Sequence, residues 1–139
     1  MTTRKLSVLI LVVVVQATAG CAEGNDPAQT PPPDPAVLTH DVDMLAARVA
    51  DGADVGDHEF GHTLAPFENE SFDRWPEREL GELISSFQRL RTSLVSRYHI
   101  VDPICTDDSW VRYSLCEPGY PCVAAVQLAE LHCLWFVAH

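Results

Sequence analysis

The sequence has 139 residues and five cysteines, and its 20 acidic side chains outnumber the nine basic ones, giving a formal net charge of −11. This length suits one small domain with a short additional segment. Nucleic-acid phosphates require a positively charged surface, so the composition excludes nucleic-acid binding as the expected function.

The first 20 residues have the three-part order of a secretory signal peptide. Arg4 and Lys5 give a positive start, residues 6–15 form an apolar run, and small residues occupy 17–20. The apolar run is about half of the roughly 20 residues that a helix needs to cross the hydrocarbon core. We therefore predict a cleaved signal peptide over residues 1–20. Its loss removes two positive charges and changes the formal charge from −11 to −13.

The predicted signal peptide ends just before a cysteine. Ala19, Gly20 and Cys21 resemble the lipobox of bacterial lipoproteins, although Thr18 stands where leucine is usual. The resemblance implies that Cys21 carries a diacylglyceryl lipid with palmitate-like chains. It also implies an exported protein held to the cell membrane or outer membrane by this lipid, with its domain outside the cytoplasm. The alternative is an ordinary secreted protein that is cut nearby.

A proline-rich segment follows and then the domain itself. Residues 21–36 contain five prolines and few apolar side chains, which predicts an extended tether. Residues 37–139 are the expected disulfide-stabilised domain. Its first predicted element is a helix over residues 39–51, with Thr39 as the N-cap and Gly52 just beyond its end.

Residues 58–62 read HEFGH, which is the strongest chemical motif in the chain. On a helix, residues four apart face the same way, so His58 and His62 can ligate one zinc ion. Glu59 is then the candidate catalytic base acting on a zinc-bound water. The motif resembles that of the zincin metallopeptidases.

A zinc centre of this type needs a third protein ligand. In the gluzincin branch a glutamate from a following helix supplies it, and the resemblance assigns this role to Glu82. Gly81 and Ser86 replace the Asn and Asp that flank the family's glutamate. Pro66 predicts that the motif helix is barely two turns long, and no room remains before it for the zincin sheet. Three alternatives stay open: no metal, zinc binding without turnover, and a small metallopeptidase.

The clearest helix prediction covers residues 76–98. Pro76 suits the first helical position, Glu77 and Glu79 favour the positive end, and Arg97 lies near the negative end. Apolar side chains recur at intervals of three and four, which predicts a core-facing stripe: Leu80, Leu83, Ile84, Phe87, Leu90, Leu94 and Tyr98.

The C-terminal part is ambiguous in sequence. Residues 110–115 alternate as a strand, residues 117–121 have turn composition, and residues 123–137 suit either a strand or a helix. With Cys21 acylated, an even set of four cysteines remains, which allows three connectivities: Cys105, Cys116, Cys122 and Cys133. An antiparallel hairpin would place the first opposite the fourth and the second opposite the third, because the two pairs have equal index sums.

These observations predict an α+β fold: one small domain with two or three helices and a C-terminal disulfide-linked hairpin. The alternative is a mostly α fold with two disulfides. The expected function is that of a lipid-anchored envelope lipoprotein with a structural or interaction role, attached to the membrane through its N-terminal lipid and contacting an envelope protein partner. The alternative is a zinc-binding or metallopeptidase-like protein using His58, Glu59 and His62.

Overall fold

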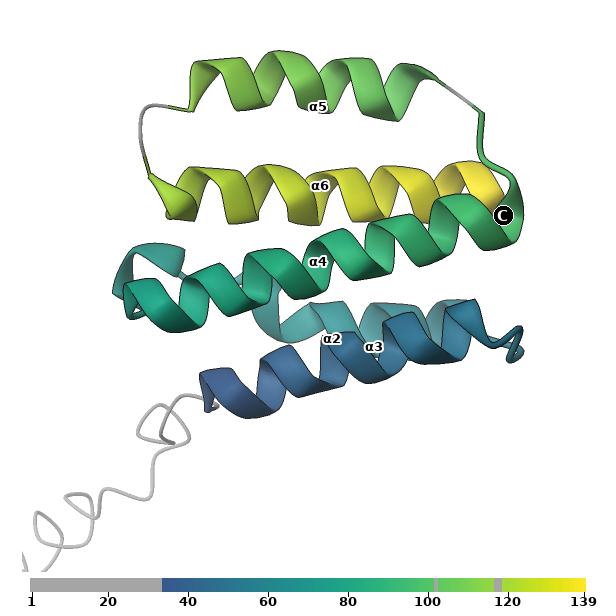
Figure 1. Cartoon of the computed structure of the whole chain (residues 1–139), viewed down its shortest axis with the longest axis horizontal. Helices are drawn as coiled ribbons and strands as arrows, with labels where there is room; N and C mark the ends of the chain where they lie inside the picture. The colour runs from purple at the N-terminus through teal and green to yellow at the C-terminus, as the bar shows by residue number, and fades with distance from the viewer. Residues whose placement is uncertain (1–33, 102, 117–118) are drawn as a thin grey trace, which may run out of the picture. The chain divides into compact units, whose positions relative to one another are not determined.

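The structure is a computed structural model that describes residues 34–101, 103–116 and 119–139. The predicted signal peptide, Cys21 and most of the predicted tether lie outside the described residues. Within them the chain forms helices and no strand (Figure 1). The elements are, in chain order, α2 (Pro35–Ala50), α3 (Asp57–Glu68), the 3-10 turn η2 (Phe72–Arg74), α4 (Glu77–Tyr98), α5 (Pro103–Leu115) and α6 (Tyr120–Ala138). The predicted α+β class is therefore wrong, and the alternative of a helical fold with two disulfides describes the domain.

Helix α2 begins four residues before the predicted start. The side chain of Asp34 accepts a hydrogen bond from the backbone N–H of Ala36 at 2.9 Å, and Pro35 occupies the first turn. Both features favour a helix N-terminus. Thr39 is consequently a buried residue inside the helix and not its cap. The end is as expected, because Gly52 follows the helix with a φ of 82°, a conformation that costs glycine little.

Helix α3 is longer than the two turns predicted from Pro66. It has 12 residues and includes this proline in its last turn, where the helix continues only two residues further. Pro66 has no N–H, so the helix lacks one backbone hydrogen bond there. The ring of Phe60 stacks on that of Trp135 with centroids 4.3 Å apart, and the Trp135 indole donates to Asp57 at 2.7 Å. These contacts hold α3 against the C-terminal part of α6.

Helix α4 confirms the prediction to within one residue and forms the centre of the domain. It packs against α2 on one side and α6 on the other (Figure 1). The predicted stripe lies in the core, with five leucine and phenylalanine side chains that are almost fully buried: Leu80, Leu83, Phe87, Leu90 and Leu94. His99 ends the helix in the left-handed conformation, with a φ of 51°.

The C-terminal part is a helical hairpin of α5 and α6, and the predicted strand over residues 110–115 is wrong. Only one side of α5 packs, against α6, so its sequence lacks the continuous apolar stripe of a core helix. Helix α6 is the one described helix long and apolar enough by length and composition to cross a membrane. In this domain Leu131 and Leu134 of α6 are buried in the core, and Glu130 is buried beside them. Core packing accounts for part of its apolar composition, since 44% of its most apolar stretch is buried.

Candidate functional site

The HEFGH motif lies on α3, as the sequence predicted, and its two histidines face solvent. His58 and His62 are both exposed, and their rings lie one helical turn apart with centroids separated by 5.9 Å. This is the geometry in which two imidazoles share one face of a helix. Phe60, between them in sequence, points the other way into the core. The motif therefore serves packing on one side of α3 and presents two histidines on the other.

Glu59 is held in an ion pair with Arg48 of α2. Its two carboxylate oxygens accept hydrogen bonds from the Arg48 guanidinium at 2.5 and 2.9 Å. The hydrogen bond to Arg48, followed by its positive charge, lowers the pKa of Glu59 below its ordinary value. A carboxylate whose two oxygens are bound in this way is a weaker base. The geometry thus assigns Glu59 a role in joining α2 to α3, and the role of catalytic base stays a prediction.

Glu82 does not join the two histidines. It lies on α4, where it is exposed and forms an ion pair with Arg78 one turn earlier at 3.6 Å. Across the part of the chain that the structure describes, no group of three His, Cys, Asp or Glu side chains is placed to hold a metal ion. The zinc centre therefore stays a hypothesis, with His58 and His62 as the two ligands that share a face.

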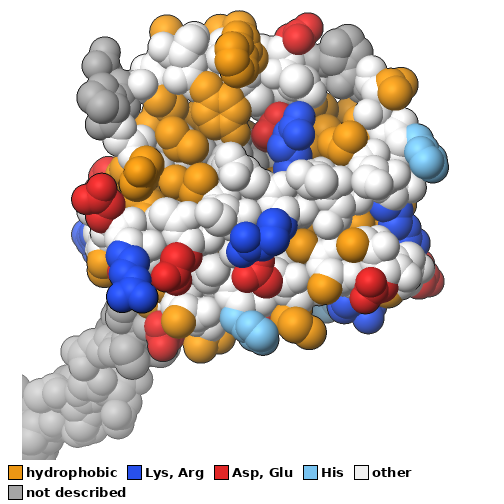
Figure 2. Space-filling view, viewed as in Figure 1, with side chains coloured by type: hydrophobic (Ala, Val, Ile, Leu, Met, Phe, Trp, Pro, Cys, Tyr) orange, Lys and Arg blue, Asp and Glu red, His pale blue; other side chains and the backbone are white. Residues whose placement is uncertain are grey.

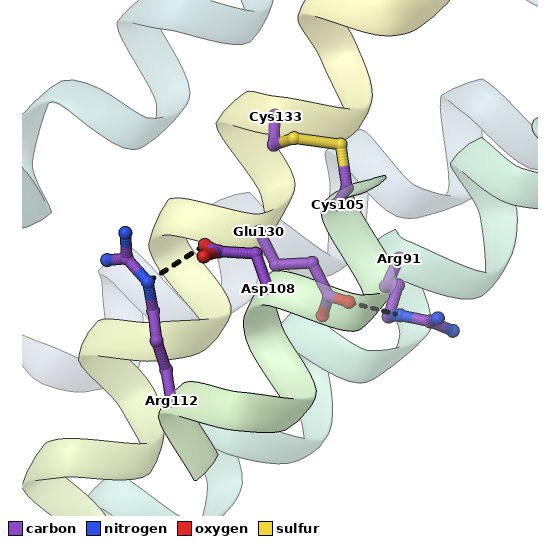
Figure 3. Close-up of a disulfide and its surroundings, with 6 residues drawn as sticks. All are labelled: Arg91, Cys105, Asp108, Arg112, Glu130 and Cys133. Carbon is purple, nitrogen blue, oxygen red and sulfur yellow. Dashed lines mark ion pairs between the residues drawn. A yellow bond between two sulfur atoms is a disulfide. The ribbon is translucent and has the colours of Figure 1, made fainter. Parts of the chain in front are cut away.

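Both disulfides connect α5 to the start and the body of α6. Cys105 pairs with Cys133 across a Cα–Cα distance of 5.7 Å (Figure 3). Cys116 pairs with Cys122 across 5.6 Å. These are the pairs that an antiparallel hairpin predicted, although the hairpin is helical. Cys105 is 1% exposed and belongs to the core, so the first disulfide is also part of the packing.

A further polar cluster between α4, α5 and α6 was missed by the sequence reasoning. Glu130 of α6 is buried and forms an ion pair with Arg91 of α4 at 3.2 Å (Figure 3). Burial, and after it the charge of Glu130, raises the pKa of Tyr113 on α5 to about 12. The sequence contained one signal of this cluster, because Glu130 is a lone charged residue in an apolar segment. A charge that becomes buried in such a segment is normally paired with an opposite charge.

Comparison with protein-family models, with curated proteins and with solved structures gives no match. What the domain does must therefore be inferred from its own residues.

Proposed function

We propose that the chain is an exported lipoprotein, acylated at Cys21, whose helical domain lies outside the cytoplasm and binds a partner in the cell envelope. One observation carries this proposal. The four cysteines of the described residues form two disulfides, and Cys21 is the fifth cysteine of the chain. Disulfides form and persist in oxidising compartments and are rare in the cytosol. The paired cysteines thus support export, and the resemblance to the lipobox gives Cys21 its separate role.

The charge of the mature chain suits this location. It has no lysine, and its net negative charge gives no attraction to anionic lipid headgroups. An attachment to the membrane would therefore come from the acyl chains. Two or more chains anchor a protein stably, whereas one chain gives only marginal binding.

Exposed apolar side chains on the helical hairpin support an interaction role. Trp110, Val111 and Leu115 project from α5, and Phe136 projects from the end of α6. A group of exposed apolar side chains on one element often marks a binding surface, whereas single exposed apolar residues are common on any protein. A lipoprotein with a tether and such a surface is suited to hold a partner near the membrane.

Acylation is tested by growing cells that express the chain with an alkyne analogue of palmitate and by mass spectrometry of the mature amino terminus. We expect the label on the wild-type chain and a terminus beginning at lipid-modified Cys21. Cys21→Ser should lose the label and release the domain from the membrane fraction. The matched control, Cys116→Ser with Cys122→Ser, should keep the label. An unmodified terminus at another residue in the wild-type chain would refute the anchor.

A further inference from the structure

A groove runs between α4 and α5, with α6 as its floor. Its volume is about 540 Å³, within the range typical of sites for small organic ligands. Helix α6 lies between the other two, so α4 and α5 form opposite walls (Figure 1). Figure 2 shows apolar side chains gathered over α5 and α6 around a hollow that contains one positive and one negative side chain.

Each helix contributes to the groove at helical spacing. Helix α4 provides Gln88, Arg91 and Thr92, and α5 provides Thr106, Trp110 and Tyr113. Residues three or four apart lie on one face of a helix, so each wall presents a continuous row of side chains. The rows are mainly hydroxyl, amide and guanidinium groups beside two aromatic rings. Such a lining offers hydrogen-bonding groups beside apolar surface.

The floor of the groove is polar and incompletely satisfied. Gln127 is 5% exposed, and its side-chain oxygen has no hydrogen-bond partner among the described residues. Its amide nitrogen makes only a long hydrogen bond of 3.4 Å to the backbone oxygen of Ile84. A buried acceptor without a partner is unfavourable, so a ligand that brings a donor to this amide would be stabilised by the new hydrogen bond. Gln127 is one of the residues that line the groove, and binding would require its side-chain amide to turn so that the oxygen meets the ligand.

The groove is electrically neutral on a strongly acidic protein. Arg91 and Glu130 are the charged side chains that line it, and they form an ion pair with each other. Asp108 and Arg112 of α5 pair along their own helix at 2.8 Å and are not part of the lining (Figure 3). No net charge is left to recognise an ion. The ligand should therefore be neutral and rich in donors and acceptors.

Trp110 gives the groove a flat apolar surface. Its side chain lies on the α5 wall and is 75% exposed, so most of the indole surface is accessible. An exposed tryptophan beside amide, hydroxyl and guanidinium groups matches one ligand chemistry well. A sugar ring has an apolar C–H face that stacks on an aromatic ring, and hydroxyls that exchange hydrogen bonds with the planar polar groups around it.

We propose that the α4–α5–α6 groove binds a neutral saccharide, with a sugar ring stacked on Trp110 and its hydroxyl or N-acetyl groups bonded to Arg91 and Gln127. The proposal does not depend on acylation of Cys21, since it concerns the folded domain alone. Arg91 donates to sugar oxygens from a guanidinium that Glu130 holds in place. Gln127 accepts from a hydroxyl or an amide N–H of the ligand.

The test uses the Cys21→Ser chain, exported and purified with its disulfides formed. Chitotriose and maltotriose serve as saccharide probes, and binding is measured by tryptophan fluorescence and by ¹⁵N chemical-shift titration. We expect saturable binding of at least one sugar, with shifts concentrated at Arg91, Trp110 and Gln127. Trp110→Ala should weaken this binding about tenfold, as expected for the loss of an aromatic stacking contact.

A matched control separates the groove from general exposed apolar surface. Phe136 is 82% exposed and does not line the groove, so Phe136→Ala should leave the affinity unchanged. Failure of both sugars to bind saturably, or binding that Trp110→Ala does not weaken, would overturn the proposal. Trilysine is included as a cationic probe, and its binding in preference to both sugars would also overturn it by showing that the site selects positive charge.

Discussion

The disulfide between Cys105 and Cys133 should contribute more to stability than the one between Cys116 and Cys122. The perturbation is a pair of double variants, Cys105→Ala with Cys133→Ala and Cys116→Ala with Cys122→Ala. The first bridge spans 28 positions and the second spans six. A bridge stabilises mainly by reducing the entropy of the unfolded chain, and this effect grows with the logarithm of loop length.

The magnitude follows from the two loop lengths. The chain-entropy relation gives about 3.6 kcal/mol for the longer loop and about 2.2 kcal/mol for the shorter one. Cys105 is 1% exposed, so its truncation also removes buried sulfur from the core, at a further cost of about 1 kcal/mol. The free energy of unfolding of a small domain is about 5–15 kcal/mol in total. The loss of this one bridge therefore removes roughly a third or more of that total.

The assay is urea denaturation followed by far-ultraviolet circular dichroism, together with amide hydrogen exchange in the absence of denaturant. We expect the midpoint to fall in both variants and to fall further in the one that lacks Cys105 and Cys133. Among the described helices α5 packs mainly on α6, so its amides should lose protection before those of α2 and α4 do. Equal midpoints in the two variants, or unchanged protection of α5, would refute this account of how the hairpin is held.

Three further predictions concern single sites. His99→Gly should raise the free energy of unfolding by about 0.5 kcal/mol, measured in a thermal melt. Glycine relieves the strain of the left-handed conformation, and its larger loss of entropy on folding offsets part of this gain. A lower melting temperature would contradict this prediction. Tyr113 should ionise near pH 12 in an absorbance titration. The free energy of unfolding should fall between pH 10 and 12, where only the unfolded state has lost the tyrosine proton. Glu130→Gln should lower the pKa of Tyr113, and an unchanged pKa would argue against the charge of Glu130 as a cause. Zinc offered to the purified chain should be lost with the excess metal, since within the described residues no third ligand joins His58 and His62. Stoichiometric zinc that survives removal, and that disappears when both histidines are changed to alanine, would restore the predicted centre.

The sequence predicted α4 well because the local and tertiary signals agree there. Its apolar residues recur at the helical period, and the same residues form the core, so one pattern fixes both the helix and its buried face. The α3 motif was only partly predictable. Helical spacing placed His58 and His62 correctly, but the engagement of Glu59 by Arg48 depends on how α2 crosses α3, which local patterns do not encode.

The cysteine pairs were predictable while the surrounding structure was not. Any antiparallel pair of segments with equal rise per residue conserves the sum of opposed positions, whether the segments are strands or helices. The spacing nevertheless carried a further signal. Cys105 and Cys116 are 11 positions apart, as are Cys122 and Cys133, and 11 residues make about three helical turns. Helices therefore place both cysteines of each arm on one face, toward the partner helix, whereas strands would point them to opposite faces.

The groove could not be predicted because its walls come from helices that are distant in the sequence. The pairing of Arg91 with Glu130 crosses from α4 to α6, and residues 110–115 were interpreted as a strand. In a strand, Trp110 and Tyr113 would lie on opposite faces. In the helix they are three positions apart and share one wall.

The nesting of the two disulfides affects how the domain withstands proteolysis. Exposed connections between helices are the preferred sites of proteolytic cleavage. A protease that cuts the chain between Cys116 and Cys122 would break one peptide bond and release no fragment, because both bridges still join α5 to α6. In the proposed location outside the cytoplasm, where proteases would meet the domain, such a cut is expected to leave the core and the groove in place.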